Sequence, residues 1–172
     1  TGDAYFNVSH DADRHFIVES ENYCIEVLGT SFYVDAGAGK NKLSVIVSTG
    51  KVSVYKKDSP DKKIMISAGE RADISSSDTL PAPVNNNDSN FLSWKTSIIE
   101  FNDTPLPEVI RILNKTYAAD IRLKGSGVEN CRITAVFEKK SLDAVLSILK
   151  STLDLQVESD GKTFTLSGDG CR

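Results

Sequence analysis

The sequence is poor in the residues that most catalytic and metal centres need. Among its 172 residues there are only two histidines, His10 and His15, and three cysteines, none of which forms a C-x-x-C pair. Zinc sites usually draw their ligands from closely spaced cysteines or histidines, so this spacing predicts none. The nucleophile elbow, the phosphate-binding glycine loop and the H-E-x-x-H motif are also missing. We therefore expect no cofactor and no direct small-molecule substrate.

Positive charge and long apolar runs are scarce as well. The formal net charge is −4, and the 20 lysine and arginine residues are dispersed along the chain. Nucleic-acid binding depends on a concentrated basic surface, so nucleic acid is not an expected partner. No apolar run approaches the roughly 20 residues that cross a bilayer as a helix. The sequence as given therefore predicts no membrane span.

The clearest positive signal is an amphipathic helix that ends at Tyr117. Thr104 followed by Pro105 predicts its start, with the threonine hydroxyl capping early amides and the proline at the first helical position. Apolar residues then recur at helical spacing, while charged and polar residues occupy the other side. The apolar positions are Leu106, Val109, Ile110, Leu113 and Tyr117. One face of this helix is predicted to be buried.

The same pattern returns 36 positions later, where Phe137 matches Phe101. The second helix repeats the apolar positions as Leu142, Val145, Leu146, Leu149 and Leu153. Each copy reads strand, helix, strand, with strands expected at 98–101, 121–123, 133–137 and 155–157. A final hairpin is expected to pair residues 155–157 with 164–166. Two such units predict one small α+β domain, with both helices packed on one face of a single sheet.

The first half of the chain, residues 1–74, is predicted to be all-β. It contains eight short apolar or alternating runs, separated by turn residues and without helical spacing. This pattern is typical of an antiparallel sandwich or roll. Residues 75–93 are polar and contain two prolines and a run of asparagines, so we interpret them as a linker. The predicted fold class is α+β, an all-β sandwich or roll followed by a βαβ-βαβ-type domain at 94–172.

Two groups of residues invite a chemical interpretation. His10, Asp11, Asp13 and His15 could ligate a metal if their loop curled around it, but the spacing fixes no geometry and favours a plain polar turn between two strands. We assign no metal site. Cys24 alternates with apolar neighbours and is interpreted as a small core residue.

The bond between Gly29 and Thr30 carries a second hypothesis. If its backbone were strained, the Thr30 hydroxyl could attack the Gly29 carbonyl, moving the acyl group from nitrogen to oxygen and leaving a hydrolysable ester. The simpler interpretation is a glycine-threonine bend between two strands, and the residues alone favour it.

Taken in order, several motifs resemble the periplasmic part of FecR-type anti-sigma regulators. They are GDAYFNV followed by RHFIVES, then VLGTSFYV, VIVSTGKVSVY, SAGER and the stretch from Trp94 through TPLPEVIRIL. The resemblance implies a FecR domain in front of a module similar to the short N-terminal domain of secretins and TonB-dependent receptors, in a layout common in Bacteroidetes. Family members also carry an upstream cytoplasmic anti-sigma segment and one inner-membrane helix. This chain would then be the periplasmic sensor portion.

The resemblance also implies a function. A loaded outer-membrane TonB-dependent receptor, of the kind used for iron or glycan uptake, would present its periplasmic signalling domain to the C-terminal module. The message would cross the inner membrane and release an ECF-type sigma factor that binds the cytoplasmic segment. Cleavage at a Gly-Thr bond occurs among relatives, and Gly29-Thr30 falls in the matching motif.

We expect a signalling module without turnover, in which a partner strand adds to an exposed sheet edge. The candidate edge is the final hairpin, with Leu155, Val157, Phe164 and Leu166 as candidate partner-binding residues. The alternatives are a protein that cleaves its own Gly29-Thr30 bond and a glycan-binding β-sandwich. The sequence shows no aromatic platform for a glycan, because its early aromatics all lie in predicted strands.

Overall fold

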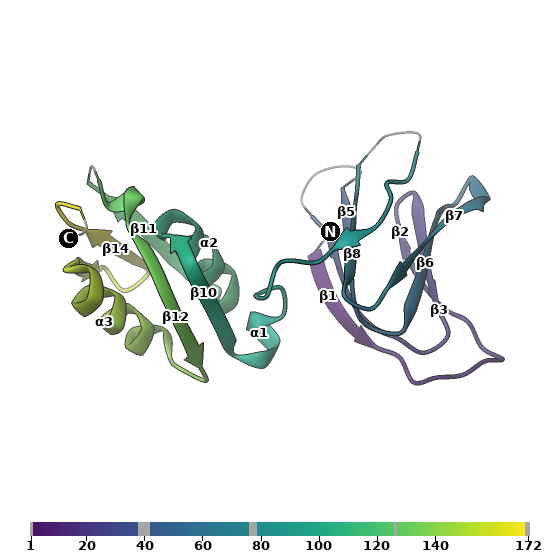
Figure 1. Ribbon diagram of the computed structural model, residues 1–172, viewed down its shortest axis with the longest axis horizontal. Coiled ribbons are helices and arrows are strands. Elements are labelled where there is room, and N and C mark those ends of the chain that lie inside the picture. Colours follow the sequence, from purple (N-terminus) through teal and green to yellow (C-terminus); the bar gives the residue numbers. More distant parts are fainter. Residues whose placement is uncertain (1, 38–41, 76–78, 126, 171–172) are drawn as a thin grey trace. The chain divides into compact units, whose positions relative to one another are not determined.

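The computed structural model describes residues 2–37, 42–75, 79–125 and 127–170, and the chain divides into two compact units, Thr1–Asn87 and Asp88–Arg172. Among the described residues, the first unit contains strands and no helix, and the second contains strands and helices, which confirms the α+β class (Figure 1). Within the described ranges, no helix has the length and apolarity needed to cross a membrane. Each unit has its own hydrophobic core.

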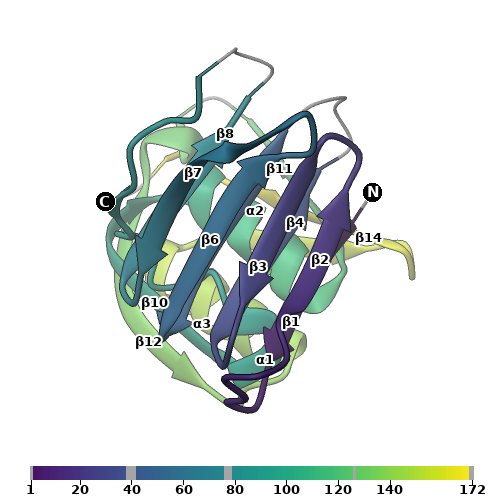
Figure 2. The ribbon, with the colours of Figure 1, turned by 90° about the vertical axis from the view of Figure 1, so that its right-hand side faces the viewer.

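The N-terminal unit is a sandwich of two antiparallel sheets. One has the strand order β1-β4-β5-β8-β9, formed by Gly2–Asn7, Ser31–Ala36, Leu43–Thr49, Glu70–Ile74 and Val84–Asn85. The other, seen face-on in Figure 2, has the order β2-β3-β6-β7, formed by Phe16–Ser20, Tyr23–Val27, Lys51–Lys56 and Ser59–Ser67. Alternate residues from both sheets, such as Ile25 and Phe32, fill one shared core. All eight predicted strands are confirmed.

The segment 75–93 contains more structure than its composition suggests. Val84 and Asn85 form β9 and pair with Arg71 and Glu70 of β8 in the first unit. The boundary between the two units falls between Asn87 and Asp88, inside this segment. A one-turn helix, α1 (Ser93–Thr96), then opens the second unit.

The C-terminal unit contains two sheets, where the sequence predicted one. In the part of the chain that the structure describes, β10 (Ile98–Pro105) pairs with β12 (Arg132–Glu138) alone, and the pair is antiparallel. The other sheet has the order β11-β14-β13, formed by Asp120–Lys124, Thr163–Ser167 and Gln156–Ser159. In it β11 runs parallel to β14, and β13 runs antiparallel to β14. The prediction of a single sheet is therefore wrong.

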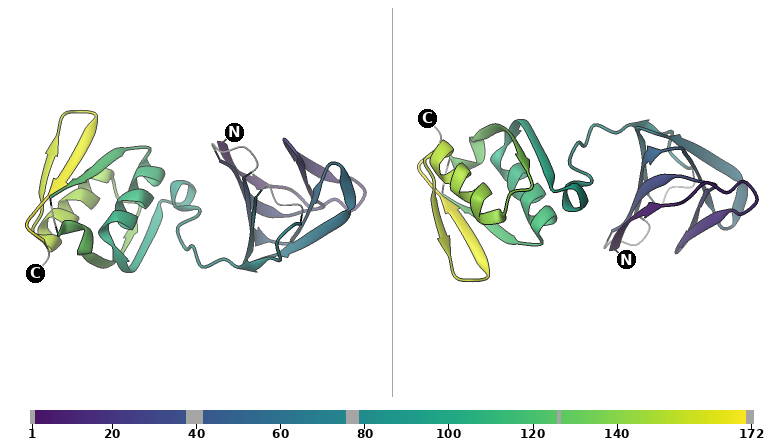
Figure 3. Two further views of the ribbon diagram at one scale, coloured as in Figure 1. Left: turned by 90° about the horizontal axis from the view of Figure 1, so that it is seen from above. Right: turned by 90° about the horizontal axis from the view of Figure 1, so that it is seen from below.

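Helix burial explains this difference. α2 (Leu106–Tyr117) packs against β10 of one sheet and β11 of the other, and Figure 3 shows the helices α2 and α3 (Leu142–Leu153) between the sheets. Ile112 is buried although it lies outside the predicted apolar stripe. A helix covered on two sides needs a wider apolar surface than one packed on a single sheet.

The 36-residue repeat itself is confirmed. α2 and α3 each span 12 residues and begin at equivalent positions, Leu106 and Leu142. β11 and β13 begin at Asp120 and Gln156, which are also 36 positions apart. Phe101 and Phe137 lie in one core with their ring centroids 6.0 Å apart. The two copies therefore face each other across a shared interior.

The predicted start of α2 is wrong by one residue. Thr104 and Pro105 belong to β10, and the helix begins at Leu106 with Pro107 in its first turn. The Thr104 hydroxyl lies 3.1 Å from the Asn102 amide nitrogen and caps no helical amide. Pro107 lacks an amide hydrogen, but amides in the first turn of a helix have no partner within the helix, so proline still marks the start.

The cysteines differ in environment. Cys24 is a buried free thiol, but it lies on the outer face of the four-stranded sheet, opposite Glu19 and Tyr55, and outside the central core cluster. The burial of Cys24 agrees with its interpretation as a small core residue, although it lies outside the central cluster. Cys131 is buried and disulfide-bonded. Cys171 lies outside the described residues.

Candidate functional site

In the hairpin predicted to bind a partner, the backbone edge of β13 is accessible, whereas two of the four predicted side chains are buried. Leu155 and Leu166 are 3% and 0% exposed and belong to the core of the C-terminal unit. Val157 and Phe164 are half-buried and pack against the same core. A partner cannot reach the side chains of Leu155 and Leu166 in the folded unit. What remains accessible in this hairpin is the edge of β13, whose other side pairs with β14.

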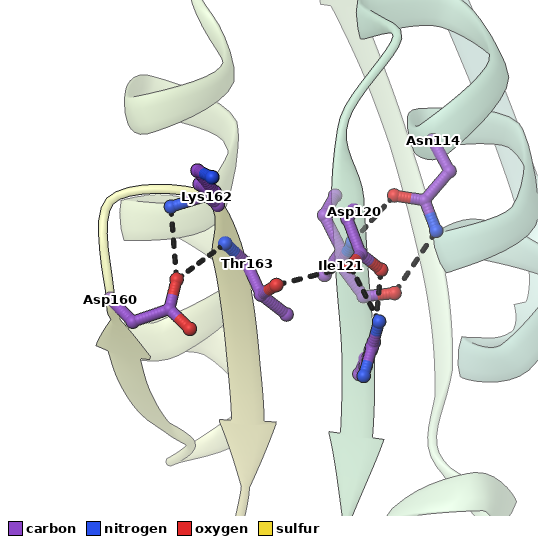
Figure 4. Close-up of polar contacts among 7 residues, drawn as sticks. Asn114, Asp120, Ile121, Asp160, Lys162 and Thr163 are labelled. Carbon is purple, nitrogen blue, oxygen red and sulfur yellow. Dashed lines mark hydrogen bonds and ion pairs between the residues drawn. The ribbon is translucent and has the colours of Figure 1, made fainter.

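A polar network holds the turn of this hairpin (Figure 4). The Asp160 carboxylate accepts hydrogen bonds from the amides of Thr163 and Lys162, at 2.7 and 2.9 Å. These amides lower the pKa of Asp160 below its ordinary value. The Thr163 hydroxyl donates across to Asp120 at 3.0 Å, and the guanidinium of Arg122, followed by this hydroxyl, lowers the pKa of Asp120. Charged hydrogen bonds thus join β14 to the start of β11.

An asparagine closes the far edge of the same sheet. The Asn114 side chain, on α2, accepts a hydrogen bond from the Ile121 amide at 2.7 Å and donates one to the Ile121 carbonyl at 3.0 Å (Figure 4). In a strand, the residue whose amide and carbonyl both face outward would receive a further strand there. Asn114 therefore occupies the place that a neighbouring strand would take beside β11.

A second asparagine closes the edge of β10 in the same way. Asn90 donates to the Glu100 carbonyl at 2.7 Å and accepts from the Glu100 amide at 2.8 Å. Nearby, the Thr96 hydroxyl accepts from the amide of Ile98 at 3.2 Å. The sequence analysis missed both asparagines, because a polar residue in a helix or a loop gives no sign that its side chain binds a strand edge.

The Gly29-Thr30 bond lies in a tightly packed part of the N-terminal unit. Thr30 is 3% exposed, its hydroxyl donates to the Lys51 carbonyl at 2.9 Å, and its backbone pairs with Val8. A methyl group at Gly29 would lie 2.4 Å from the Cα of His10, which explains why glycine is present. Neither Gly29 nor Thr30 has a positive φ, and the bond is not cis. The backbone strain that the cleavage hypothesis invoked is not observed in these angles.

The polar residues around His10 and His15 turn to separate partners. His15 contacts the Glu26 carboxylate, and Asp11 accepts from the Arg14 guanidinium at 2.7 Å. This bond to Arg14 lowers the pKa of Asp11. Across the described ranges, no group of three or more histidine, cysteine, aspartate or glutamate side chains could hold a metal ion.

The early aromatic residues pack on one another. Phe6 stacks on Phe32, with ring centroids 5.1 Å apart, and its ring centroid lies 6.0 Å from that of Phe16. Phe32 and Tyr33 are 0% and 2% exposed. Phe6 and Phe32 belong to the core of the sandwich and Tyr33 is buried outside that cluster, so of these four rings only Phe16, which is 41% exposed, is open to a sugar ring.

Sequence and structure comparisons agree with this architecture. The FecR protein family model matches residues 1–53, which cover most of the sandwich strands, and the model of the FecR C-terminal domain matches residues 98–166. The chain belongs to the FecR-type anti-sigma factors. Its N-terminal unit contains the FecR domain, and the strand-helix-strand repeat forms the FecR C-terminal domain. No curated protein matches the chain by sequence.

Two crystal structures of a proposed anti-sigma factor from Parabacteroides distasonis ATCC 8503 are similar over nearly the whole chain. The structure at 1.65 Å resolution is 28% identical and covers 96% of this chain and 76% of its own, with a TM-score of 0.64. The structure at 2.50 Å is 27% identical and covers 98% and 78%, with the same TM-score. The similarity to these structures thus extends over both units of this FecR-type chain.

Proposed function

We propose that this chain is the periplasmic sensor region of a single-pass inner-membrane anti-sigma factor, which relays a signal from an outer-membrane TonB-dependent receptor to an ECF-type sigma factor. The observation that carries the proposal is the match of both units to FecR-type models in the family's order. The receptor's periplasmic signalling domain binds the C-terminal unit. The sigma factor binds the cytoplasmic segment that family members carry.

The physical features of the chain fit such a role. The described surface has sheet edges where a protein segment can bind by main-chain hydrogen bonds, and the described residues hold no cluster of metal-ligating side chains. The disulfide at Cys131 is compatible with the oxidising environment of the periplasm. Signal relay by binding needs these features and no reactive pocket.

The proposal is tested by cross-linking and co-purification of the tagged full-length protein from its native cell envelope. A TonB-dependent receptor should be recovered, and its purified periplasmic domain should then bind the present chain in solution. Recovery of no such receptor, or absence of binding at high micromolar concentrations of the purified domain, would refute the relay.

Intact-mass measurement tests the alternative of self-processing. We expect the purified chain to keep its full mass, because the Thr30 hydroxyl is engaged with the Lys51 carbonyl and the angles at Gly29 and Thr30 show no strain. Two fragments, one ending at Gly29 and one starting at Thr30, would contradict this expectation. Their loss in Thr30→Ala would assign the cleavage to the hydroxyl.

A further inference from the structure

The two sheets of the C-terminal unit have four outer edges, and they are not equally available. In β10, Asn90 holds the outward amide and carbonyl of Glu100 and Thr96 holds the amide of Ile98. In β11, Asn114 holds the amide and carbonyl of Ile121. β13 is open but has only four residues, of which Gln156, Glu158 and Ser159 are exposed and polar. Short and charged edges are common protections against unwanted strand pairing.

β12 carries exposed charged side chains at its two ends, Arg132 and Glu138, but it is not short and no described side chain caps the backbone at its centre. It is seven residues long, and its pairing with β10 is its only strand pairing in the described part of the chain. Val136 lies opposite Glu100 in the register of this pair. Because Asn90 takes both backbone groups of Glu100, the two opposed residues do not hydrogen-bond to each other, and the amide and carbonyl of Val136 point away from β10. Among the described residues, no hydrogen bond to these two groups is observed.

The two copies of the repeat differ in which of their sheet edges are capped. Val136 and Val157 occupy the positions 36 residues after Glu100 and Ile121, the two residues whose backbones the asparagines hold. The position equivalent to Asn114 is Lys150, whose ammonium group can donate but cannot accept a hydrogen bond from an amide. The first copy of the repeat thus has closed edges, while the second copy lacks the corresponding cap beside β13.

The side chains around Val136 indicate what the edge would bind. Val136 is 60% exposed, the most exposed large apolar residue in the described structure, and Ile98 on the neighbouring strand is 39% exposed. Glu100 and Glu138 lie on the same outward face and are exposed. An added strand with an apolar side chain beside Val136 and a basic one beside Glu138 would complement this face.

We propose that the receptor's signalling domain adds an extended strand to the open edge of β12, centred on Val136. This inference rests on the proposed function and specifies where on the C-terminal unit the receptor binds. Main-chain hydrogen bonds to Val136 supply the affinity, and the apolar and acidic side chains select the partner strand.

The test uses the full chain and the purified signalling domain of the receptor recovered by co-purification. Val136→Pro removes an outward amide that the β10–β12 ladder does not use, and proline is tolerated at such edge positions. We expect binding to weaken by about tenfold or more, which corresponds to roughly 1.4 kcal/mol. Val136→Lys, which keeps the amide, is a second variant in case the proline variant does not fold, and it should weaken binding similarly by placing a charge at the edge.

Gln156→Lys on β13 is the matched control, since it adds the same charge to an exposed residue of the other open edge, and it should leave binding unchanged. Binding that survives both Val136 substitutions, or that only Gln156→Lys weakens, would overturn the β12 assignment while the relay stands. No binding by the unsubstituted chain would refute the proposed function and the assignment together. Self-association of the chain that Val136→Lys abolishes and the receptor domain does not displace would show that β12 binds a second copy, and would also overturn the assignment.

Discussion

Asn114 provides the sharpest test of how the C-terminal unit is built. Asn114→Ala removes two hydrogen bonds to the Ile121 backbone, at 2.7 and 3.0 Å. At about 1 kcal/mol each, these bonds contribute about 2 kcal/mol, of which the better helix propensity of alanine offsets about 0.6. We therefore expect the C-terminal unit to lose about 1.4 kcal/mol of unfolding free energy. For a urea slope of about 2 kcal/mol per molar, the midpoint would fall by about 0.7 M.

Urea unfolding followed by tryptophan fluorescence measures this loss in the intact chain. Trp94, in α1, is the only tryptophan, so its signal reports on the C-terminal unit. Lys150→Ala is the matched control, because Lys150 occupies the equivalent position in α3 and is exposed. It should change the stability by no more than about 0.5 kcal/mol. Equal effects of the two substitutions would refute the view that Asn114 acts as an edge cap.

Three further predictions concern other parts of the chain. Gly29→Ala should destabilise the N-terminal unit by about 1–3 kcal/mol, because its methyl group would lie 2.4 Å from the Cα of His10. Circular dichroism during urea unfolding measures this loss. Gly37→Ala is the control, since its methyl group would lie 3.5 Å from the Asp35 carboxylate, and an equal effect of the two substitutions would contradict the prediction. Reduction of the Cys131 disulfide should lower the unfolding free energy of the C-terminal unit by about 2–5 kcal/mol and leave that of the N-terminal unit unchanged. Trp94 fluorescence and circular dichroism during urea unfolding measure the two effects, and an unchanged Trp94 transition would contradict the prediction. Because the folded pKa values of Asp120 and Asp160 are lowered, their stabilising contribution is present above the ordinary value of 3.8 and is lost as the pH falls through the folded pKa values. The protection of amides in the β13–β14 hairpin, measured as the ratio of intrinsic to observed hydrogen-exchange rate, should therefore fall below pH 3.8. Asp160→Asn should reduce this fall; identical pH profiles of protection would argue against it.

The sequence predicts local structure well and strand partners poorly. The helices at Leu106 and Leu142 follow from apolar spacing, which depends on nearby residues alone. The division of their strands into two sheets does not, because nothing local shows that β10 pairs with β12 or that β11 runs parallel to β14. Ile112 was the available sign, since its apolar side chain lies outside the stripe that a single sheet would bury.

The predicted docking residues show a related limit. Leu155 and Leu166 appear, in sequence, as apolar residues of a terminal hairpin, and burial decides whether a partner can reach them. Both are core residues because they lie on the side of the three-stranded sheet that packs on the helices. Val136, at the centre of the open β12 edge, resembles any strand valine. Its exposure follows from its place on the outward face of the two-stranded sheet, which only the fold reveals.

Asn114 and Lys150 show that the two copies of a repeated motif can differ at their sheet edges while they share a core. Both copies keep the residues that fill the interior, since either would lose its packing without them. Residues at the sheet edges do not fill the interior, so they can differ between the copies. Asn114 caps the edge of β11 in the first copy, and the edge of β13 in the second copy has no such cap. An amide side chain in place of Lys150 would then close the edge of β13 and leave the edge of β12 open, without disturbing the interior.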